Sequence, residues 1–524
     1  MENNFCQNCG AKLEKGSSFC HNCGASIIIE KEIPDEERFK RHSERQPTTV
    51  YQIDKQEERK YSSDSDSSSK KKSKGLIAGI IIAIIVFGSI AIILPIALLA
   101  SFGPFNYDYM GTISYSYDST NISAANLDIA NRAGDISITY DNSLSSLFEA
   151  TIDVYGRNKA TMNDTENFSD ELINNEVQIT FDSWTSYYEW FDKKAIRHDL
   201  NILINPQATV NYNIKTGSGE IFLDLTSPAN TTITEFSISS GSGDIEILVD
   251  NNINFDVSDF NVETSSGNNY LDFGDNIVIN ANYFDICTSS GDIDIVMGSG
   301  VNLTASEITI HTSSGNNQLN FEGNSLVNAD TILFCSGSGD IGIFSEKPGI
   351  VLEASLMNID VSSGKINFLL NSDNEINIEE LNLKTGSGDI TLDTGEDTTI
   401  NSSEINLDTS SGNIDIFCEE VNNQKDISWY VETGSGDITL SLEPTTLPAQ
   451  SYSALFYCKT SSGNINIDYA IDEYTVGVKF TADTSSGRIS LPGGYDIYQS
   501  DNFDSKAIKY SFDLQTGSGD ISVD

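Results

Sequence analysis

A four-residue glycine pattern recurs through the C-terminal part of this 524-residue chain. Its consensus is Thr/Ser-Ser/Gly-Ser-Gly, and nine of the twelve intervals between successive final glycines are 24 residues long. A repeat this regular indicates one structural unit per period. The final glycines are Gly219, Gly243, Gly267, Gly291, Gly315, Gly339, Gly364, Gly388, Gly412, Gly436, Gly463, Gly487 and Gly519.

Side-chain polarity alternates on both sides of these glycines. The seventh residue before the glycine is always apolar, the fifth is apolar or small, and the fourth is mostly polar. After the glycine, the second residue is Ile in eleven of thirteen units, and the fourth is apolar in all thirteen. A third apolar position falls about twelve residues after the glycine in many units. Alternation with a period of two is typical of a strand with one buried face.

Three short strands per period predict a mainly β fold, a three-sided β-solenoid of 13–14 coils whose equivalent positions stack about 4.8 Å apart. A propeller fits less well because its blades repeat at about 40 residues. Asn269 and Asn317 replace the usual Ile, and we expect local irregularity at those coils. The regular solenoid is predicted to cover residues 211–524. We expect no cap at its C-terminal end, because the chain stops five residues after Gly519.

The residue after the corner glycine alternates between Asp and a neutral or basic residue along the repeat. Carboxylates stacked about 4.8 Å apart would repel by roughly 0.9–3.5 kcal/mol, and intervening Asn, Lys or Arg residues avoid this cost. A corner column that limits repulsion is one interpretation, and a column of Ca²⁺ sites is the other. The candidate calcium ligands are Asp244, Asp292, Asp340, Asp389, Asp437 and Asp520. The repeat of calcium-binding β-rolls is absent, which weakens the calcium hypothesis.

Two Cys-x-x-Cys motifs, each followed by glycine, lie within the first 24 residues. Two such motifs ten residues apart place four thiolates around one Zn²⁺ ion. A site with four protein ligands has no open coordination position, so its role is structural. The predicted ligands are Cys6, Cys9, Cys20 and Cys23. The motif pair resembles the short zinc-ribbon modules at the ends of many prokaryotic membrane proteins, and we assign residues 1–26 to such a module.

Residues 75–101 carry no charged side chain and are almost wholly apolar. About 20 apolar residues cross ~30 Å of hydrocarbon, so we expect a single transmembrane helix there. Four lysines between residues 70 and 74 precede it, which predicts a cytoplasmic N-terminus and an extracellular C-terminal domain at the cell membrane. Residues 27–74 mix both charges and lack the apolar content for a core, so they are expected to form a flexible cytoplasmic linker.

Acidic residues are in large excess, with Asp+Glu 77 against Lys+Arg 30 and a net charge of −47. Residues 75–524 alone carry 16 basic and 64 acidic residues, or −48. This charge excludes nucleic acid as a partner of the outer domain and favours a cation or a basic protein.

Residues 102–210 are expected to hold a first coil around Gly134 and an aromatic-rich insertion. Packed, the insertion would cap the rod; exposed, its aromatic side chains would stack on sugars or contact a partner. The residues of this candidate patch are Trp184, Tyr187, Tyr188 and Trp190.

Six Asn-x-Ser/Thr sequons follow the apolar segment and suit an external surface that carries glycans. They are Asn121, Asn163, Asn167, Asn230, Asn302 and Asn401. Cys287 and Cys335 share a repeat position, but two coils, about 9.6 Å, separate them, which is too far for a disulfide. We expect free thiols at both positions.

The repeated TGSGDI and SSGNI units, together with residues 200–210, resemble the putative-adhesin domain family over about residues 120–524. The resemblance implies a β-solenoid and a surface location, and it transfers no site residues. We expect a membrane-anchored cell-surface protein, not an enzyme, whose acidic solenoid is an adhesin-like binding or spacer module for a glycan, cation or basic protein. One alternative is a transmembrane sensor that couples the outer domain to the zinc ribbon. A polysaccharide-active enzyme is a weaker alternative, because the sequence lacks an off-pattern cluster of acidic and basic residues.

Overall fold

The computed structural model describes residues 108–524, except 118–123, 157–167, 174–175, 184–195, 227–230, 252, 420–421, 424, 444–450, 471–475 and 495. The chain divides into two compact units, Met1–Ser101 and Phe102–Asp524. All described residues belong to the second unit. The zinc ribbon, the linker and the helix expected at residues 75–101 therefore lie outside the described residues.

The predicted fold class needs correction in two respects, and the first concerns the helix. The described residues contain β-strands and one short 3₁₀ turn, η2 (Phe503–Ser505), but no α-helix. No helix in this part of the chain is long and apolar enough to cross a membrane. The fold of the residues that the structure describes is thus a β-solenoid.

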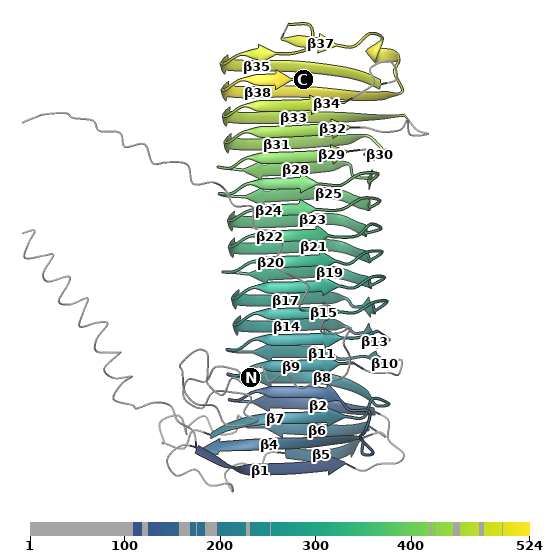
Figure 1. Ribbon diagram of the computed structural model, residues 1–524, viewed down its shortest axis with the longest axis vertical. Coiled ribbons are helices and arrows are strands. Elements are labelled where there is room, and N and C mark those ends of the chain that lie inside the picture. The colour runs from purple at the N-terminus through teal and green to yellow at the C-terminus, as the bar shows by residue number, and fades with distance from the viewer. Residues whose placement is uncertain are drawn as a thin grey trace, which may run out of the picture. The chain divides into compact units, whose positions relative to one another are not determined.

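The second correction concerns how the strands are grouped into sheets. Among the described residues, the strands form two sheets of 17 and 22 strands that face each other across one core (Figure 1). The two strands expected before each corner join into one long strand in the middle turns. In β21, for example, the ladder to the next turn skips Asp330, between Ala329 and Thr331, and then Gly337, next to the corner. One skipped residue bends the strand without ending its pairing, so in these turns the two strands expected before the corner belong to one sheet.

The 17-stranded sheet contains the strands that follow the corner glycines. It comprises β1 (Asp108–Tyr117), β3 (Ile136–Tyr140), β4 (Phe148–Gly156), β7 (Ile196–Ile204), β9 (Ile221–Leu225), β12 (Ile245–Val249), β15 (Asn269–Phe273), β18 (Ile293–Met297), β20 (Asn317–Phe321), β22 (Ile341–Ser345), β24 (Ile366–Leu369), β26 (Ile390–Asp393), β29 (Ile414–Glu419), β32 (Ile438–Glu443), β34 (Ile465–Tyr469), β36 (Ile489–Ser490) and β39 (Ile521–Val523).

The 22-stranded sheet contains the strands that precede the corners. It comprises β2 (Ala124–Asn131), β5 (Phe168–Ile173), β6 (Glu176–Asp182), β8 (Thr209–Thr216), β10 (Thr231–Ile233), β11 (Phe236–Ser240), β13 (Ile253–Asp256), β14 (Asp259–Ser266), β16 (Val278–Asn280), β17 (Tyr283–Ser290), β19 (Asn302–Thr312), β21 (Leu326–Ser338), β23 (Val351–Ser363), β25 (Glu375–Thr385), β27 (Thr399–Ile400), β28 (Glu404–Thr409), β30 (Asn422–Asn423), β31 (Ile427–Ser435), β33 (Tyr452–Ser462), β35 (Val476–Ser486), β37 (Ile497–Gln499) and β38 (Ile508–Ser518).

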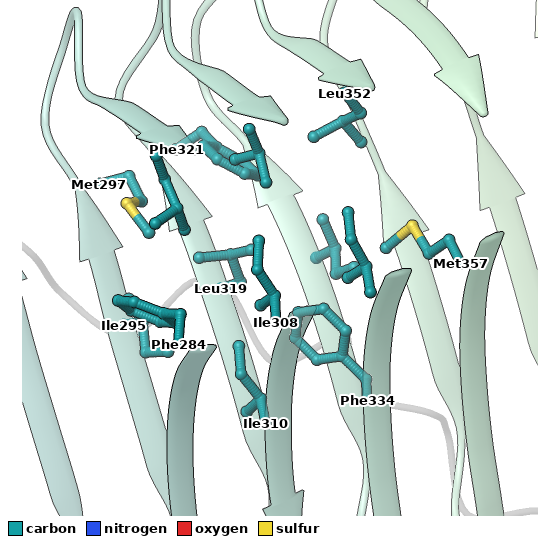
Figure 2. Close-up of a cluster of buried hydrophobic side chains, with 14 of the residues drawn as sticks. Phe284, Ile295, Met297, Ile308, Ile310, Leu319, Phe321, Phe334, Leu352 and Met357 are labelled. Atoms are coloured by element: carbon teal, nitrogen blue, oxygen red, sulfur yellow. The ribbon is translucent and has the colours of Figure 1, made fainter. Parts of the chain in front are cut away.

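About ten regular turns stack in chain order, fewer than the 13–14 coils expected, because the units at both ends are arranged differently. Within the regular part, parallel strands pair in register, so equivalent apolar residues form columns in the core. Phe260 stacks between Phe236 and Phe284, with ring centroids 4.6 and 4.7 Å apart. Figure 2 shows Phe284, Ile308 and neighbouring side chains directed into this core. Such aromatic pairs contribute about 0.5–1.5 kcal/mol beyond the area they bury.

The corner glycines stack on one another at a spacing that admits no side chain. Gly315 has a φ of +148°, and a Cβ atom there would overlap the carbonyl oxygen of Gly291. The hydroxyl of Thr312 donates to the same carbonyl oxygen at 3.1 Å. The Thr/Ser and Gly positions of the repeat therefore serve one corner, in which the hydroxyl satisfies the carbonyl and the glycine permits the close approach.

Two buried asparagines do not disturb this stack, so the expected irregularity is wrong. Asn269 and Asn317 stay in register with the residues of both neighbouring turns. Their Nδ2 groups donate to the carbonyl oxygens of Cys287 and Cys335, at 2.9 and 3.0 Å. These hydrogen bonds allow a polar side chain at a position that is otherwise Ile.

At the N-terminal end, the strands depart from chain order. β2 lies between β6 and β8, and β3 lies between β7 and β9. Antiparallel pairs then end the parallel stack, since β4 pairs with β7 and β1, and β5 pairs with β6. The described part of the insertion thus forms the terminal layers of the solenoid (Figure 1).

The C-terminal end is also closed, contrary to the sequence-based expectation. The last two strands, β38 and β39, insert between two pairs that precede them in the chain. The pair β33 and β34 lies on one side, and the pair β35 and β36 lies on the other. β37 pairs antiparallel with β35 and is the outermost strand (Figure 1). The chain end is therefore inside the stack, and residues 476–500 cover it.

Candidate functional site

Several predicted site residues lie outside the described residues. These are the zinc ligands Cys6, Cys9, Cys20 and Cys23, the aromatic residues Trp184, Tyr187, Tyr188 and Trp190, and the sequons at Asn121, Asn163, Asn167 and Asn230. The sequons at Asn302 and Asn401 are described, and both side chains are half-buried.

The corner column is held together by its own side chains. The backbone N–H of Asp292 donates to Oδ1 of Asn268 at 2.8 Å, and the N–H of Asn316 donates to Oδ1 of Asp292 at 2.8 Å. The same contact recurs from turn to turn at Asp244, Asp340, Asp389, Asp437 and Asp520. Asn and Asp both supply an Oδ1 atom that accepts this hydrogen bond. Where Asn and Asp alternate, the column therefore keeps the hydrogen bond at each turn and has half the negative charge of a column of Asp alone.

This geometry leaves the calcium hypothesis without support. One carboxylate oxygen of each corner aspartate accepts a backbone N–H of the next turn. Among the described residues, no group of three or more His, Cys, Asp or Glu side chains could hold a metal ion. Where Lys365 enters the column, its Nζ lies 2.9 Å from Oδ2 of Asp389. That contact raises the pKa of Lys365, and it lowers the pKa of Asp389 against the opposing effect of burial.

A column of Cys287, His311 and Cys335 lies on the outer face of the 22-stranded sheet, one residue per turn. Both cysteines are free thiols, as predicted. Burial and a hydrogen bond to Oδ1 of Asp285 at 2.9 Å raise the pKa of Cys287. Burial and Asp360 raise the pKa of Cys335. Both thiols therefore stay protonated at neutral pH and are poor nucleophiles.

Further along the same face, an aromatic patch is exposed that sequence reasoning missed. We call Tyr430, Leu455 and Tyr457 the Tyr430 patch. Tyr430 is 40% exposed and Leu455 is 42% exposed. The rings of Tyr430 and Tyr457 lie on adjacent strands with centroids 6.4 Å apart. The available signal was an aromatic residue at the same outward repeat position in two successive units.

Polar groups border the Tyr430 patch. The hydroxyl of Tyr457 donates to Oε1 of Gln515 at 3.4 Å. Nζ of Lys459 lies 3.7 Å from Oε2 of Glu432, and both side chains are partly exposed. Aromatic faces beside amide, carboxylate and ammonium groups offer both stacking and hydrogen bonding to one ligand.

The N-terminal end contains a buried titratable group that the sequence did not reveal. His198 is 5% exposed, and neither ring nitrogen has a hydrogen-bond partner. Its ring packs edge-on against Phe181, with centroids 5.5 Å apart. Burial lowers the pKa of His198 to about 4. Beside it, Arg197 bridges Asp135 and Asp199, with both nitrogen–oxygen distances 2.7 Å.

Two family models match parts of the chain. Residues 106–267 match the N-terminal domain of toast_rack, DUF2154. Residues 5–27 match the zinc-ribbon domain, and this segment contains all four cysteines predicted to bind zinc. The second match supports zinc binding at the N-terminus. No curated protein matches the chain.

Solved structures of two bacterial proteins are similar to the chain. A putative cell adhesion protein from Clostridium sporogenes ATCC 15579 is 9% identical, with 79% of this chain and 98% of that chain covered and a TM-score of 0.16. A putative adhesin from Bacteroides fragilis NCTC 9343 is 15% identical, with 49% and 97% covered and a TM-score of 0.25. Values this low carry no argument about what this chain binds.

Proposed function

We propose that this protein is a membrane-anchored cell-surface protein whose acidic β-solenoid is an adhesin-like binding module. The observation that carries the proposal is the Tyr430 patch, in which exposed Tyr430 and Leu455 lie beside the half-buried ring of Tyr457. Contiguous exposed apolar side chains that are rimmed by polar residues mark interaction sites.

The interior of the solenoid offers no competing site in the part of the chain that the structure describes. A cavity there lies within the core and is lined by apolar side chains alone, among them Phe284, Met297 and Phe334. A ligand therefore meets the outer faces of the sheets, along which side chains repeat from turn to turn. Surface contact of this kind suits binding of an extended ligand better than catalysis in an enclosed pocket.

The ligand that fits the Tyr430 patch best is a glycan. Sugar rings present an apolar face that stacks on tyrosine, and their hydroxyl groups hydrogen-bond to amides and carboxylates such as Gln515 and Glu432. The zinc ribbon is proposed to be a structural module in the cytoplasm, with residues 102–524 outside the cell. The support for this placement is the charge pattern around residues 70–101 of the sequence.

The test is adhesion of cells that express the full chain. We expect these cells to bind a glycan array, and the double variant Tyr430→Ala/Tyr457→Ala to bind about 5- to 150-fold more weakly, since two stacking contacts of about 0.5–1.5 kcal/mol each are lost. Tyr283→Ala is the matched control, because Tyr283 is 52% exposed on the same sheet and lies outside the patch. Protease added to intact cells checks that the solenoid is displayed.

Three results would count against the proposal. Equal binding by the double variant and the Tyr283→Ala control would remove the patch as the binding surface. Absence of any glycan binding by displayed protein would leave only the spacer role. Release of shortened sugars from a bound polysaccharide would point to an enzyme.

A further inference from the structure

The C-terminal strand occupies a slot between two layers of the solenoid. Ten of the eleven residues of β38 pair in parallel register with β33 on one side and β35 on the other. Phe512, for example, is opposite Phe456 in β33 and Phe480 in β35. β39 fills the equivalent position in the second sheet, between β34 and β36.

The side chains of this tail complete the core at that level. Phe512 stacks between Phe456 and Phe480, with centroids 4.9 and 4.6 Å apart. The hydroxyls of Tyr510 and Tyr452 share a buried hydrogen bond of 2.8 Å. The inward residues are all buried, namely Ile508, Tyr510, Phe512, Leu514, Thr516, Ile521 and Val523. Without the tail, the slot would have two strand edges with unpaired backbone groups and an apolar gap in the core. Both are unfavourable, and a strand that enters the slot removes both.

The tail reaches the slot through an exposed connection. Residues 501–507 are exposed or half-buried, and Asn502 has a φ of +60°, which is uncommon for a residue other than glycine. On β37, at the same end of the solenoid, Ile497 is 60% exposed. A short exposed hinge beside a strand pair that fills a slot favours exchange of that pair between two copies, and an uncovered apolar side chain at the end face offers a contact for the second copy.

We propose that this slot is a strand-acceptor site for the C-terminal strand of a second copy of this chain. Two copies would exchange β38 and β39 and join at their C-terminal ends. The partner's tail has the same sequence, so it places Phe512 between Phe456 and Phe480 in the same register. Only the hinge changes conformation, and the second copy covers the end face that carries Ile497. This inference stands independently of the glycan proposal.

A disulfide reports which chain supplies the tail. Cys458 and Leu514 are register partners in adjacent parallel strands, a separation that a disulfide can span. The full chain with Leu514→Cys is oxidised with diamide at increasing protein concentration and run on a non-reducing gel. We expect a disulfide-linked dimer whose share rises with concentration. The matched controls are the unaltered chain and the double variant Cys458→Ser/Leu514→Cys, neither of which gives this dimer.

A second variant covers the case in which Leu514→Cys does not fold. Removal of residues 501–505 shortens the hinge so that β38 cannot return to its own slot. The proposal expects this variant to be a folded dimer by light scattering, while the unaltered chain shows a monomer–dimer equilibrium. Two results would overturn the proposal. One is a disulfide between Cys458 and the thiol introduced by Leu514→Cys that is intramolecular at every concentration, and the other is a shortened chain that remains a folded monomer.

Discussion

Strands in the middle of this solenoid and strands at its ends pair with partners from different parts of the chain. In the middle, each turn pairs with its sequence neighbours, so β14 lies between β11 and β17. At both ends, a unit is enclosed by segments that are not its sequence neighbours. β2 precedes both of its partners in the chain, whereas β38 follows both of its partners. Periodicity therefore defines what a turn is, but not which turn it stacks on.

Because the chain is made from its N-terminus, the strands at the two ends of the solenoid assemble differently. At the N-terminal end, later strands add to either side of β2 and β3, so the end can grow outward. At the C-terminal end, β35 reaches its final position only when the tail has entered the slot beside it. In a repeat protein, stability is roughly a sum of unit and interface terms. We therefore expect the C-terminal layers to depend on one terminal strand, while the middle turns depend on many equivalent contacts.

The largest expected difference in stability is between a glycine substitution at a middle corner and one in a turn at the C-terminal end. Gly315→Ala should lower the free energy of unfolding by about 4 kcal/mol or more, because the new Cβ would overlap backbone of the adjacent turn. Gly494→Ala should cost only about 1–2 kcal/mol, because its φ is +78° but no atom lies within 4 Å of the added Cβ. Chemical denaturation measures both. Equal losses would show that backbone conformation, not stacking, makes the corner glycines necessary.

The same contrast explains which features the sequence could predict. The alternation around each glycine, from Ile214 to Leu514, predicted strands and a shared core because the pattern is local. It could not predict that Asp330 bends β21 without ending it, since a skipped residue and a corner both show two successive outward side chains. Nor could it predict that the unit around Gly519 stacks on the unit around Gly463. Units with the same sequence pattern can stack in any order, so the pattern does not identify the neighbour of each unit.

The site residues divide in a similar way. The alternating corner residues predicted a column that limits charge, and the structure adds that Asn268 and Asp292 both accept a backbone N–H. The buried position of His198 could not be read from the sequence, because it lies in β7, a strand of the insertion that carries no repeat signal. Its environment depends on Phe181, which the chain brings near from another strand.

An effect of intermediate size concerns the N-terminal end. The pKa of His198 is about 4 in the folded protein, below its ordinary value of 6.5. Between these values the unfolded chain binds a proton that the folded chain does not. Stability is therefore complete above pH 6.5 and falls by about 3 kcal/mol as the pH drops to about 4. Hydrogen exchange of β6 and β7 across this range measures the loss where it occurs.

The control for this pH dependence is His198→Phe, which keeps an aromatic ring and removes the titration. Burial raises the pKa values of Asp199 and Glu220, so these carboxyl groups favour the folded state as the pH falls. The difference between the two proteins isolates the histidine. If β6 and β7 exchange equally fast in both proteins at pH 4.5, His198 does not destabilise this end on protonation.

The smallest effects compare two corner aspartates. Asp292→Asn should change the free energy of unfolding by no more than about 0.5 kcal/mol, because the amide Oδ1 still accepts the N–H of Asn316. Asp135→Asn, at the N-terminal end, should cost about 1 kcal/mol, because it removes the partly exposed ion pair with Arg197. Thermal melting measures both, with and without Ca²⁺. If Asp292→Asn abolished a Ca²⁺-dependent rise in Tm, the column would bind calcium. If it cost more than Asp135→Asn, charge in the middle column would stabilise the turns and alternation would not serve to dilute repulsion.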